Sequence, residues 1–227
     1  MNILLTSAGR RSYMVTYFKE ALKGLGEVHA SNSVYTYTLR CADKYVVTPN
    51  IYDSTYIEFL LDYCINHEIK AIISLFDIDL PILAINKALF EKNGIKVIVS
   101  DYTTTQICND KWKTYEFLTK NRINNIPSFI DLEDAKLSLR NGSIHYPLII
   151  KPRWGMGSIG IYKVNNDDEL DVLYKKLHSE IFDTYLKYES IETSNNCILI
   201  QELIIGQEVG LEVLNDLNGN YVTSIAK

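Results

Sequence analysis

A glycine-rich segment with basic residues at its start is the first part of this sequence that could do chemistry. Lys151 stands at the end of the apolar run of residues 147–150, and Arg153 follows it in a loop. The loop contains small residues that let backbone N–H groups approach an anion closely: Gly155, Gly157, Ser158 and Gly160. We interpret the segment as a phosphate-covering loop between two strands, with Lys151 and Arg153 adding positive charge at its rim. The alternative is an ordinary glycine-rich hairpin beside a surface lysine.

Residues 201–208 could hold the rest of a nucleotide. An apolar strand ends in Gln201 and Glu202, crosses Gly206 and resumes with Glu208. Such a crossing exposes backbone donors and acceptors that can read the edge of a planar base. A carboxylate a few residues further on could accept the two hydroxyls of a ribose. The alternative is a plain surface turn with two solvated glutamates.

Lys111 is the third candidate. Either Asn109 or Asp110 could cap a helix that starts at this point, which places Lys111 in the first turn. A cation is mildly unfavourable there because of the helix dipole. A functional lysine would show this conflict, although many surface lysines tolerate it.

The composition narrows the classes of function. The chain has 227 residues and a formal net charge of −5, so it has no broad electrostatic reason to bind nucleic acid or an anionic membrane. No apolar stretch approaches the roughly 20 residues of a membrane span, and the N-terminus lacks a signal-peptide pattern. We therefore expect a soluble, cytoplasmic protein with no nucleic-acid or membrane partner.

The cysteines and histidines are too scattered to predict a metal site. With no CxxC pair, the cysteines are expected to be reduced and mostly buried. We expect no metal ligands within the chain and find no local support for a nucleophilic triad. The residues concerned are Cys41, Cys64, Cys108, Cys197, His29, His67, His145 and His178.

The first hundred residues alternate between strands and helices. The apolar runs at residues 2–6, 27–31, 71–75 and 96–100 predict strands, and the amphipathic segments at 12–23, 54–67 and 78–92 predict helices. This order is typical of βαβ units, so we expect an α/β domain with a doubly wound, parallel sheet.

The pattern changes near residue 100. Residues 101–121, with an interruption near 109–110, and residues 167–188 predict helices. Strands are predicted at 127–130, 146–151, 160–164, 197–202, 207–214 and 221–226. This arrangement favours an antiparallel, α+β second domain. We expect two domains, residues 1–100 and residues 101–227.

Three motifs in series resemble the nucleotide-binding elements of ATP-grasp enzymes: residues 109–111 with the following helix, residues 148–160, and residues 201–208. The chain resembles the large subunit of carbamoyl-phosphate synthetase and its stand-alone relatives. Residues 4–11, 40–45 and 77–79 resemble the Rossmann-like domain that precedes the ATP-grasp domain in these enzymes.

The resemblance implies roles for individual residues. Lys111 and Lys151 would contact the phosphates of ATP, with Lys151 also near the adenine. The backbone of Glu202 and Ile204 would face the adenine edge, and Glu208 would hold the ribose. Residues 126–199 would form a lid subdomain. The implied nucleotide-binding residues are Lys111, Lys151, Arg153, Gly155, Gly157, Ser158, Gly160, Gln201, Glu202, Leu203, Ile204 and Glu208.

The resemblance also implies a reaction. A carboxylate is phosphorylated by ATP, and an amine or a thiol displaces the phosphate from the acyl-phosphate. Mg²⁺ is the implied cofactor, and its ligands are expected beyond residue 227. We therefore expect an incomplete ATP-grasp domain, inactive alone and completed by further sequence or a separate C-terminal chain, and we weigh a homodimer as well. The alternative function is a non-catalytic nucleotide-binding or interaction module with the same fold.

Four charged residues of the first domain are candidates for binding the other substrates. Arg10 and Arg11 follow the first strand, at the edge where open sheets bind ligands, and could bind a carboxylate or phosphate. Asp77 and Asp79 follow the strand at 71–75 at the same edge. The alternatives are solvated or interdomain arginines, and a helix N-terminus that favours negative charge.

Overall fold

The computed structural model describes residues 1–227, except for the side chain of Glu192. The chain divides into two compact units, Met1–Gln106 and Ile107–Lys227. Each unit has a main sheet and buried hydrophobic residues of its own.

Unit 1 contains a five-stranded parallel sheet in the order β3-β2-β1-β4-β5, which confirms the predicted α/β class. Its strands are β1 (Asn2–Thr6), β2 (Val28–Asn32), β3 (Lys44–Val47), β4 (Ile69–Ser74) and β5 (Lys96–Val97). The chain leaves β1 in one direction for β2 and β3, and in the other for β4 and β5. The switch point, where ligands bind in open sheets, therefore lies between β1 and β4.

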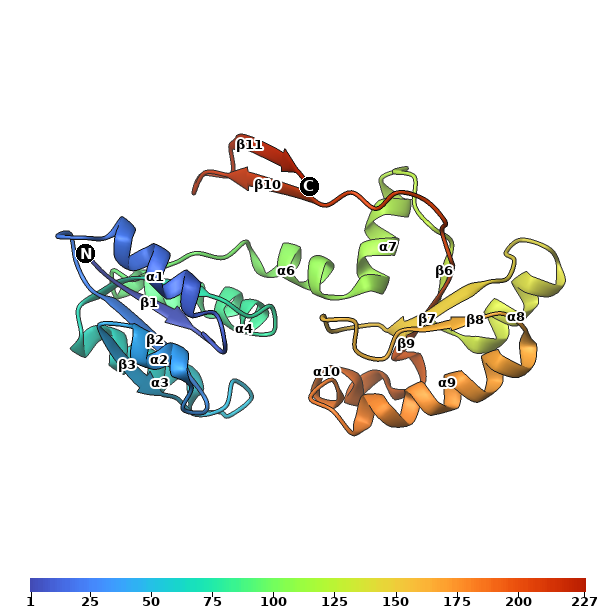
Figure 1. Ribbon diagram of the computed structural model, residues 1–227, viewed down its shortest axis with the longest axis horizontal. Helices are drawn as coiled ribbons and strands as arrows, with labels where there is room; N and C mark the ends of the chain where they lie inside the picture. Colours follow the sequence, from blue (N-terminus) through green and yellow to red (C-terminus); the bar gives the residue numbers. More distant parts are fainter. The chain divides into compact units, whose positions relative to one another are not determined.

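Helices cover both faces of this sheet (Figure 1). Ile3 and Leu5 of β1 belong to a core with helices α1 (Ser12–Ala21) and α2 (Tyr37–Cys41), whereas Leu4 belongs to the core on the opposite face. That second core includes residues of α3 (Tyr56–Asn66), α4 (Asp79–Ile85) and α5 (Lys87–Lys92). Because neighbouring residues of a strand face opposite sides, burial on both sides explains the unbroken apolar run.

Two predictions for unit 1 need correction. The helix expected at residues 78–92 is two helices, which meet at Asn86. The Asn86 side chain donates to the Ile82 carbonyl at 2.8 Å, and such side-chain bonds compete with the helical ladder. The edge strand β3 was not predicted, because its residues are mostly exposed and lack a buried apolar face.

Unit 2 contains a four-stranded antiparallel sheet in the order β6-β9-β7-β8. Its strands are β6 (Ser128–Phe129), β7 (Leu148–Pro152), β8 (Tyr162–Val164) and β9 (Ile198–Glu202). The helices of the unit are α7 (Lys111–Lys120), α8 (Leu132–Arg140), α9 (Asp167–Phe182) and the short α10 (Lys187–Ser190), after α6 (Tyr102–Asn109) at the boundary. Helix α9 runs along one face of the sheet (Figure 1), where Leu170 and Leu177 join Leu148 and Ile150 in one core.

The alternation of β7 decides where Lys151 lies. Leu148, Ile150 and Pro152 are buried, whereas Ile149 and Lys151 are only half-buried and belong to the opposite face. In the register with β9, Lys151 is opposite Leu199 and Ile149 is opposite Gln201. The sheet therefore presents Lys151 away from the α9 core.

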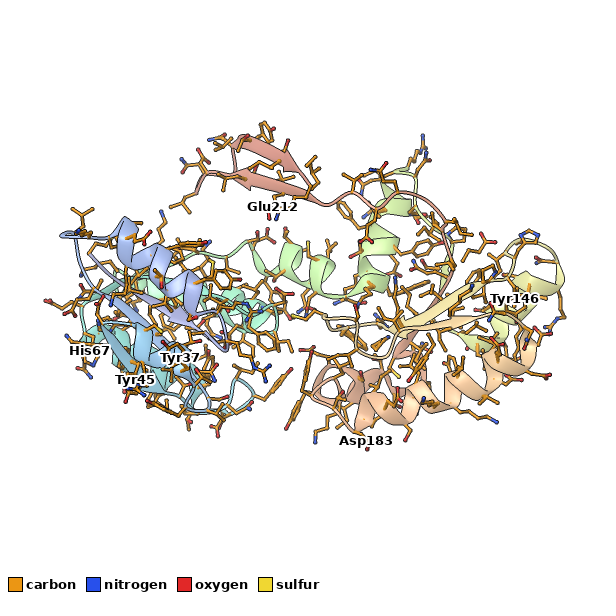
Figure 2. All side chains as sticks on the ribbon, in the orientation of Figure 1. Tyr37, Tyr45, His67, Tyr146, Asp183 and Glu212 are labelled. Atoms are coloured by element: carbon orange, nitrogen blue, oxygen red, sulfur yellow. The ribbon has the colours of Figure 1, made fainter. Side chains whose placement is uncertain are left out.

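The remaining elements of unit 2 differ from the prediction at their ends. Helix α9 ends at Phe182 and not at residue 188, because the Thr184 hydroxyl bonds the Ile181 carbonyl at 3.0 Å and accepts the Leu186 N–H at 3.3 Å. The last strands, β10 (Leu211–Asn215) and β11 (Tyr221–Ala226), form an antiparallel hairpin whose residues are all exposed. Glu212 marks β10 in Figure 2.

Candidate nucleotide-binding site

Lys151 is placed by the end of β7. Its side chain is half-buried, and this loss of water lowers the pKa of its ammonium group. A lysine in this setting gains most from an anionic ligand, because the ligand would replace the lost hydration. The structure thus places Lys151 where the sequence expected it, at the start of the glycine loop.

Lys111 lies close enough to Lys151 to be influenced by its charge. Lys111 is the first residue of α7; its N–H donates to the Arg153 carbonyl at 3.2 Å, and its Nζ donates to the Gly155 carbonyl at 2.9 Å. Burial and then the charge of Lys151 lower the pKa of Lys111 to about 8, against a partial opposing effect of Asp110. The two ammonium groups form a concentrated positive site at the base of the glycine loop.

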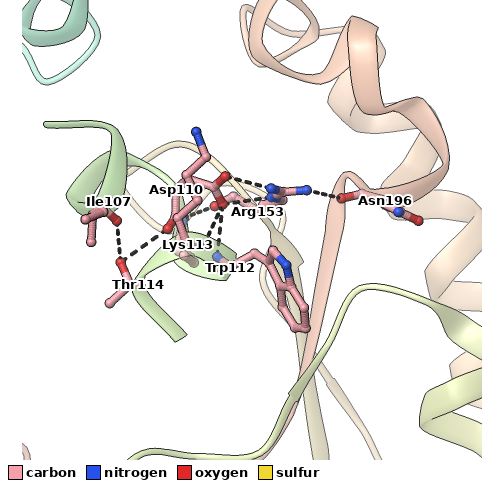
Figure 3. A network of polar contacts seen from close by, with 8 residues as sticks. Ile107, Asp110, Trp112, Lys113, Thr114, Arg153 and Asn196 are labelled. Atoms are coloured by element: carbon pink, nitrogen blue, oxygen red, sulfur yellow. Dashed lines mark hydrogen bonds and ion pairs between the residues drawn. The ribbon is translucent and has the colours of Figure 1, made fainter. Parts of the chain in front are cut away.

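Arg153 differs from the expectation that it lies at the rim of the loop. It is buried, and its Nε and Nη2 each lie 2.7 Å from an oxygen of the Asp110 carboxylate (Figure 3). Asp110 also caps α7 by accepting the N–H of Trp112 at 2.9 Å, so it is the cap that the sequence left open between Asn109 and Asp110. A guanidinium that cannot be deprotonated needs such a partner when buried.

The glycines of the loop do two different things. Gly155 and Gly160 have positive φ, and an added Cβ would lie 2.5 Å from Leu186 Cδ2 and 2.6 Å from Leu177 Cδ1, respectively. Contact with these two buried leucines and the positive φ therefore both favour glycine at these positions. Gly157 also has positive φ but nothing within 4 Å of an added Cβ, and with Ser158 it is exposed at the tip. The tip is the part of the loop whose backbone is free to face an anion.

The end of β9 shows which backbone groups are already used. The Leu203 N–H donates to the Pro147 carbonyl at 2.9 Å, so this donor is committed to the sheet. Because N–H and C=O groups of neighbouring strand residues point to opposite edges, those of Glu202, the last residue of β9, point away from β7. On that side the neighbouring strand is β6, in which Ser128 is opposite Gln201. The residue before Ser128 is Pro127, which has no N–H to donate.

The side chains of this segment have separate partners. Gln201 Nε2 donates to Ser128 Oγ at 2.6 Å across the β6–β9 pair. The Glu202 carboxylate accepts the His145 N–H at 2.5 Å. Ile204 and Glu208 are exposed in the connection that leads to β10. The Glu202 carboxylate and the Leu203 N–H are thus committed to other contacts, whereas Ile204 and Glu208 are exposed.

The four candidate residues of unit 1 separate into exposed and buried ones. Arg10 and Asp77 are exposed, and Arg11 is half-buried just before α1. Asp79 is fully buried as the first residue of α4, and its carboxylate accepts four hydroxyl groups at 2.7 to 2.9 Å. The donors are Thr6, Ser7, Tyr56 and Ser74. These contacts occupy both oxygens of Asp79 and favour a structural role.

Sequence reasoning missed the Asp110–Arg153 pair and the hydroxyl groups around Asp79. The paired residues are separated by 43 positions, and Asp79 is 73 positions from Thr6. The partner of a buried charge cannot be read from the sequence when, as here, the start of a helix packs against residues that are distant in the chain. An arginine that directly follows a buried strand is the one signal that could have raised the question.

The described side chains were searched for groups that could bind a metal ion. Across residues 1–227, with the Glu192 side chain outside the search, no three His, Cys, Asp or Glu side chains group together as metal ligands. The cysteines are free: Cys64 and Cys197 are buried, Cys41 is half-buried and Cys108 is exposed. Every helix in the described part of the chain falls short of the length and apolar character that a membrane span needs.

Comparison with known proteins identifies both units. Residues 3–98 match the family described as PylC-like, N-terminal domain, and residues 144–227 match the ATP-grasp domain. The D-alanine–D-alanine ligase of Thermotoga petrophila is 28% identical over 139 residues, which are 61% of this chain and 40% of that enzyme. The carbamoyl phosphate synthase large chain of Thermoanaerobacter sp. is 27% identical over 128 residues, 55% of this chain and 10% of that one.

A solved structure extends the likeness to the fold of the whole chain. The biotin carboxylase domain of the Hydrogenobacter thermophilus 2-oxoglutarate carboxylase, solved with MgADP, has a TM-score of 0.70 at 22% identity. The match covers 97% of this chain and 48% of that chain, so the present chain spans less than half of each of these proteins.

The fold and these matches define a two-unit α/β protein of the ATP-grasp class. The chain belongs to the ATP-grasp superfamily: it has a PylC-like N-terminal domain followed by ATP-grasp sequence, and it is distantly similar to the carbamoyl phosphate synthase large chain.

Proposed function

We propose that unit 2 binds ATP and that the protein is an ATP-dependent carboxylate–amine or carboxylate–thiol ligase that acts through an acyl-phosphate. The observation that carries the proposal is the pair of half-buried lysines at the base of the glycine loop. Burial lowers the pKa of both, and their charges repel each other. An ATP triphosphate would relieve both penalties at once.

The residues of the site fit ATP in three parts. Lys111 and Lys151 would hold the phosphates, with the exposed loop tip at Gly157 and Ser158 covering them. The backbone of Glu202 and Ile204 would read the adenine edge, and Glu208 would accept the ribose hydroxyls. Arg10, Arg11 and Asp77 remain candidates for the carboxylate and amine substrates.

The described residues do not themselves form a Mg²⁺ site, so we assign no ligand for this ion and route no step through it. In phosphoryl transfer, positioning and electrostatic stabilisation supply most of the catalysis. On this basis the two lysines act on the charge of the transferred phosphoryl group. The four free cysteines favour a reducing compartment, and we propose the cytoplasm.

The test is calorimetric titration with ATP. Lys151→Ala removes one charged hydrogen-bond donor, worth about 1.5–3 kcal/mol, so the ATP affinity is expected to fall roughly 10- to 100-fold. Lys175→Ala is the matched control, because Lys175 is exposed on α9, the helix that packs on the opposite face of the sheet. Equal ATP affinities of the Lys151 and Lys175 variants would refute the phosphate site. Tight ATP binding by a protein that releases no ADP with any carboxylate and amine would favour the non-catalytic module.

A further inference from the structure

The buried Asp110–Arg153 pair adjoins both lysines in the sequence. Lys111 directly follows Asp110, and Lys151 lies two residues before Arg153. Asp110 and Arg153 are 1% and 8% exposed, and two parallel contacts of 2.7 Å join their charged groups. This geometry is the bidentate arrangement that fixes both the distance and the orientation of the partners.

The pair connects three segments of unit 2 (Figure 3). Asp110 belongs to the start of α7, where it also accepts the Trp112 and Lys113 N–H groups at 2.9 and 3.4 Å. Arg153 follows β7; its N–H donates to the Cys197 carbonyl at 2.8 Å and its Nη1 to the Asn196 carbonyl at 3.5 Å. The start of α7, the end of β7 and the entry to β9 therefore meet at one ion pair.

Lys111 sits in a position that is costly without such a restraint. Its ammonium group is half-buried, it is repelled by Lys151, and it occupies the N-terminal turn of α7, where the helix dipole disfavours a cation. A free lysine side chain would escape this position by turning into water. Its Nζ instead donates to the carbonyls of Gly155 at 2.9 Å and Arg153 at 3.3 Å. Both carbonyls are within reach of Nζ only while the loop stays against α7.

We propose that Asp110 and Arg153 are positioning residues: their ion pair fixes the first turn of α7 against the end of β7, and so keeps the ammonium group of Lys111 beside that of Lys151 as a preformed polyphosphate site. The ligand in this inference rests on the proposed function, whereas the placement of Lys111 does not. A buried ion pair is weak evidence for stability but a good means of fixing geometry. A preformed site needs no reorganisation when the charged ligand arrives.

The test uses a variant that removes the pair without leaving a buried charge. In the double variant Asp110→Asn with Arg153→Met, asparagine keeps the helix cap and methionine keeps apolar volume, so the fold is expected to persist. The readout is the pH titration of the Lys111 Cε ¹³C signal in the ligand-free protein, assigned by its loss in Lys111→Arg. We expect the Lys111 pKa to rise from about 8 towards the ordinary lysine value of about 10.4. A Lys111 pKa that stays near its parent value in the folded double variant would overturn the proposal.

In the single variant Asp110→Asn, the direction of the change in the Lys111 pKa is the test. If Lys111 stays in place, the loss of a neighbouring negative charge lowers its pKa further; if Lys111 is released into water, its pKa rises. We expect a rise, and a fall would overturn the proposal. Asp131→Asn is the matched control, because Asp131 caps α8 in the same way by accepting the Glu133 and Asp134 N–H groups. It is expected to leave the Lys111 titration unchanged.

Measuring ATP affinity in the parent protein and the double variant separates this proposal from the proposed function. If both are correct, the double variant binds ATP roughly tenfold more weakly than the parent protein, as expected when one charged contact is misplaced. If the parent protein does not bind ATP at all, the proposed function fails while the Lys111 titration still decides the role of the pair. Unchanged ATP affinity together with a raised Lys111 pKa would contradict the claim that the preformed arrangement serves the phosphate site.

Discussion

At the scale of single residues, the site consists of charges that differ in whether they are already paired. Arg153 is neutralised by Asp110 and buried, whereas the pKa values of Lys111 and Lys151 are lowered because burial disfavours their charged forms. The sequence alone treats Lys151 and Arg153 as equivalent cations at one loop. The strand alternation and the partner 43 residues away separate them into a half-buried lysine on the face of β7 away from the core and a buried, paired arginine.

Glu208 carries a prediction at this scale. It is exposed in the connection before β10, where its carboxylate is free to accept both ribose hydroxyls. Glu208→Gln is expected to weaken ATP binding by about 1 kcal/mol and to reduce the preference for ATP over 2′-deoxy-ATP, because an amide oxygen accepts less strongly than a carboxylate. Glu58→Gln, the same change at an exposed glutamate of α3, is the control. An unchanged preference ratio in the Glu208 variant would leave this residue a solvated turn glutamate.

At the scale of elements, the loop between β7 and β8 divides into packed ends and an open tip. Gly155 and Gly160 are required by contacts with Leu186 and Leu177, whereas Gly157 is required only by its backbone conformation. The sequence shows the glycines as one motif with one purpose. It cannot show that Leu177 of α9 and Leu186, just before α10, pack against two of them, because those contacts depend on the tertiary structure.

This division predicts that two alanine substitutions differ in how they affect stability and ATP binding. Gly155→Ala places a Cβ 2.5 Å from the buried Leu186 side chain and is expected to destabilise the fold by about 2–4 kcal/mol, as for overpacking combined with a strained backbone. Gly157→Ala adds only the cost of positive φ, about 1–2 kcal/mol, but screens the tip backbone and lowers the ATP affinity. Urea unfolding and calorimetry measure the two effects, and equal loss of stability in both variants would contradict the division.

The elements also show where sequence patterns suffice. Buried parallel strands such as β1 and β4 were predicted because their apolar runs reflect cover on both faces. The split between α4 and α5 was not, since it depends on the Asn86 side chain binding a carbonyl one turn back. Edge strand β3 was not predicted either, because an exposed strand carries no hydrophobic period. Elements with buried apolar residues can be predicted from the sequence. Exposed strands, and breaks caused by a side-chain hydrogen bond, cannot.

At the scale of the whole molecule, the formal charge of −5 works against an anionic ligand at long range. The attraction for the ATP phosphates must therefore come from the local arrangement of Lys111 and Lys151. This is the central claim of the proposed function, and it makes the binding depend on the protonation of a lysine whose pKa is about 8.

The pH dependence of ATP affinity tests this claim most directly. A bound triphosphate favours the charged ammonium, so the Lys111 pKa is higher in the complex than in the free protein, and binding takes up a proton in the interval between the two pKa values. ATP affinity measured by calorimetry is therefore expected to decline above about pH 8. In Lys111→Arg, which stays charged throughout, the decline is expected to lessen. A parent protein whose ATP affinity is unchanged up to about pH 9.5, or an arginine variant with the same decline as the parent, would contradict the account.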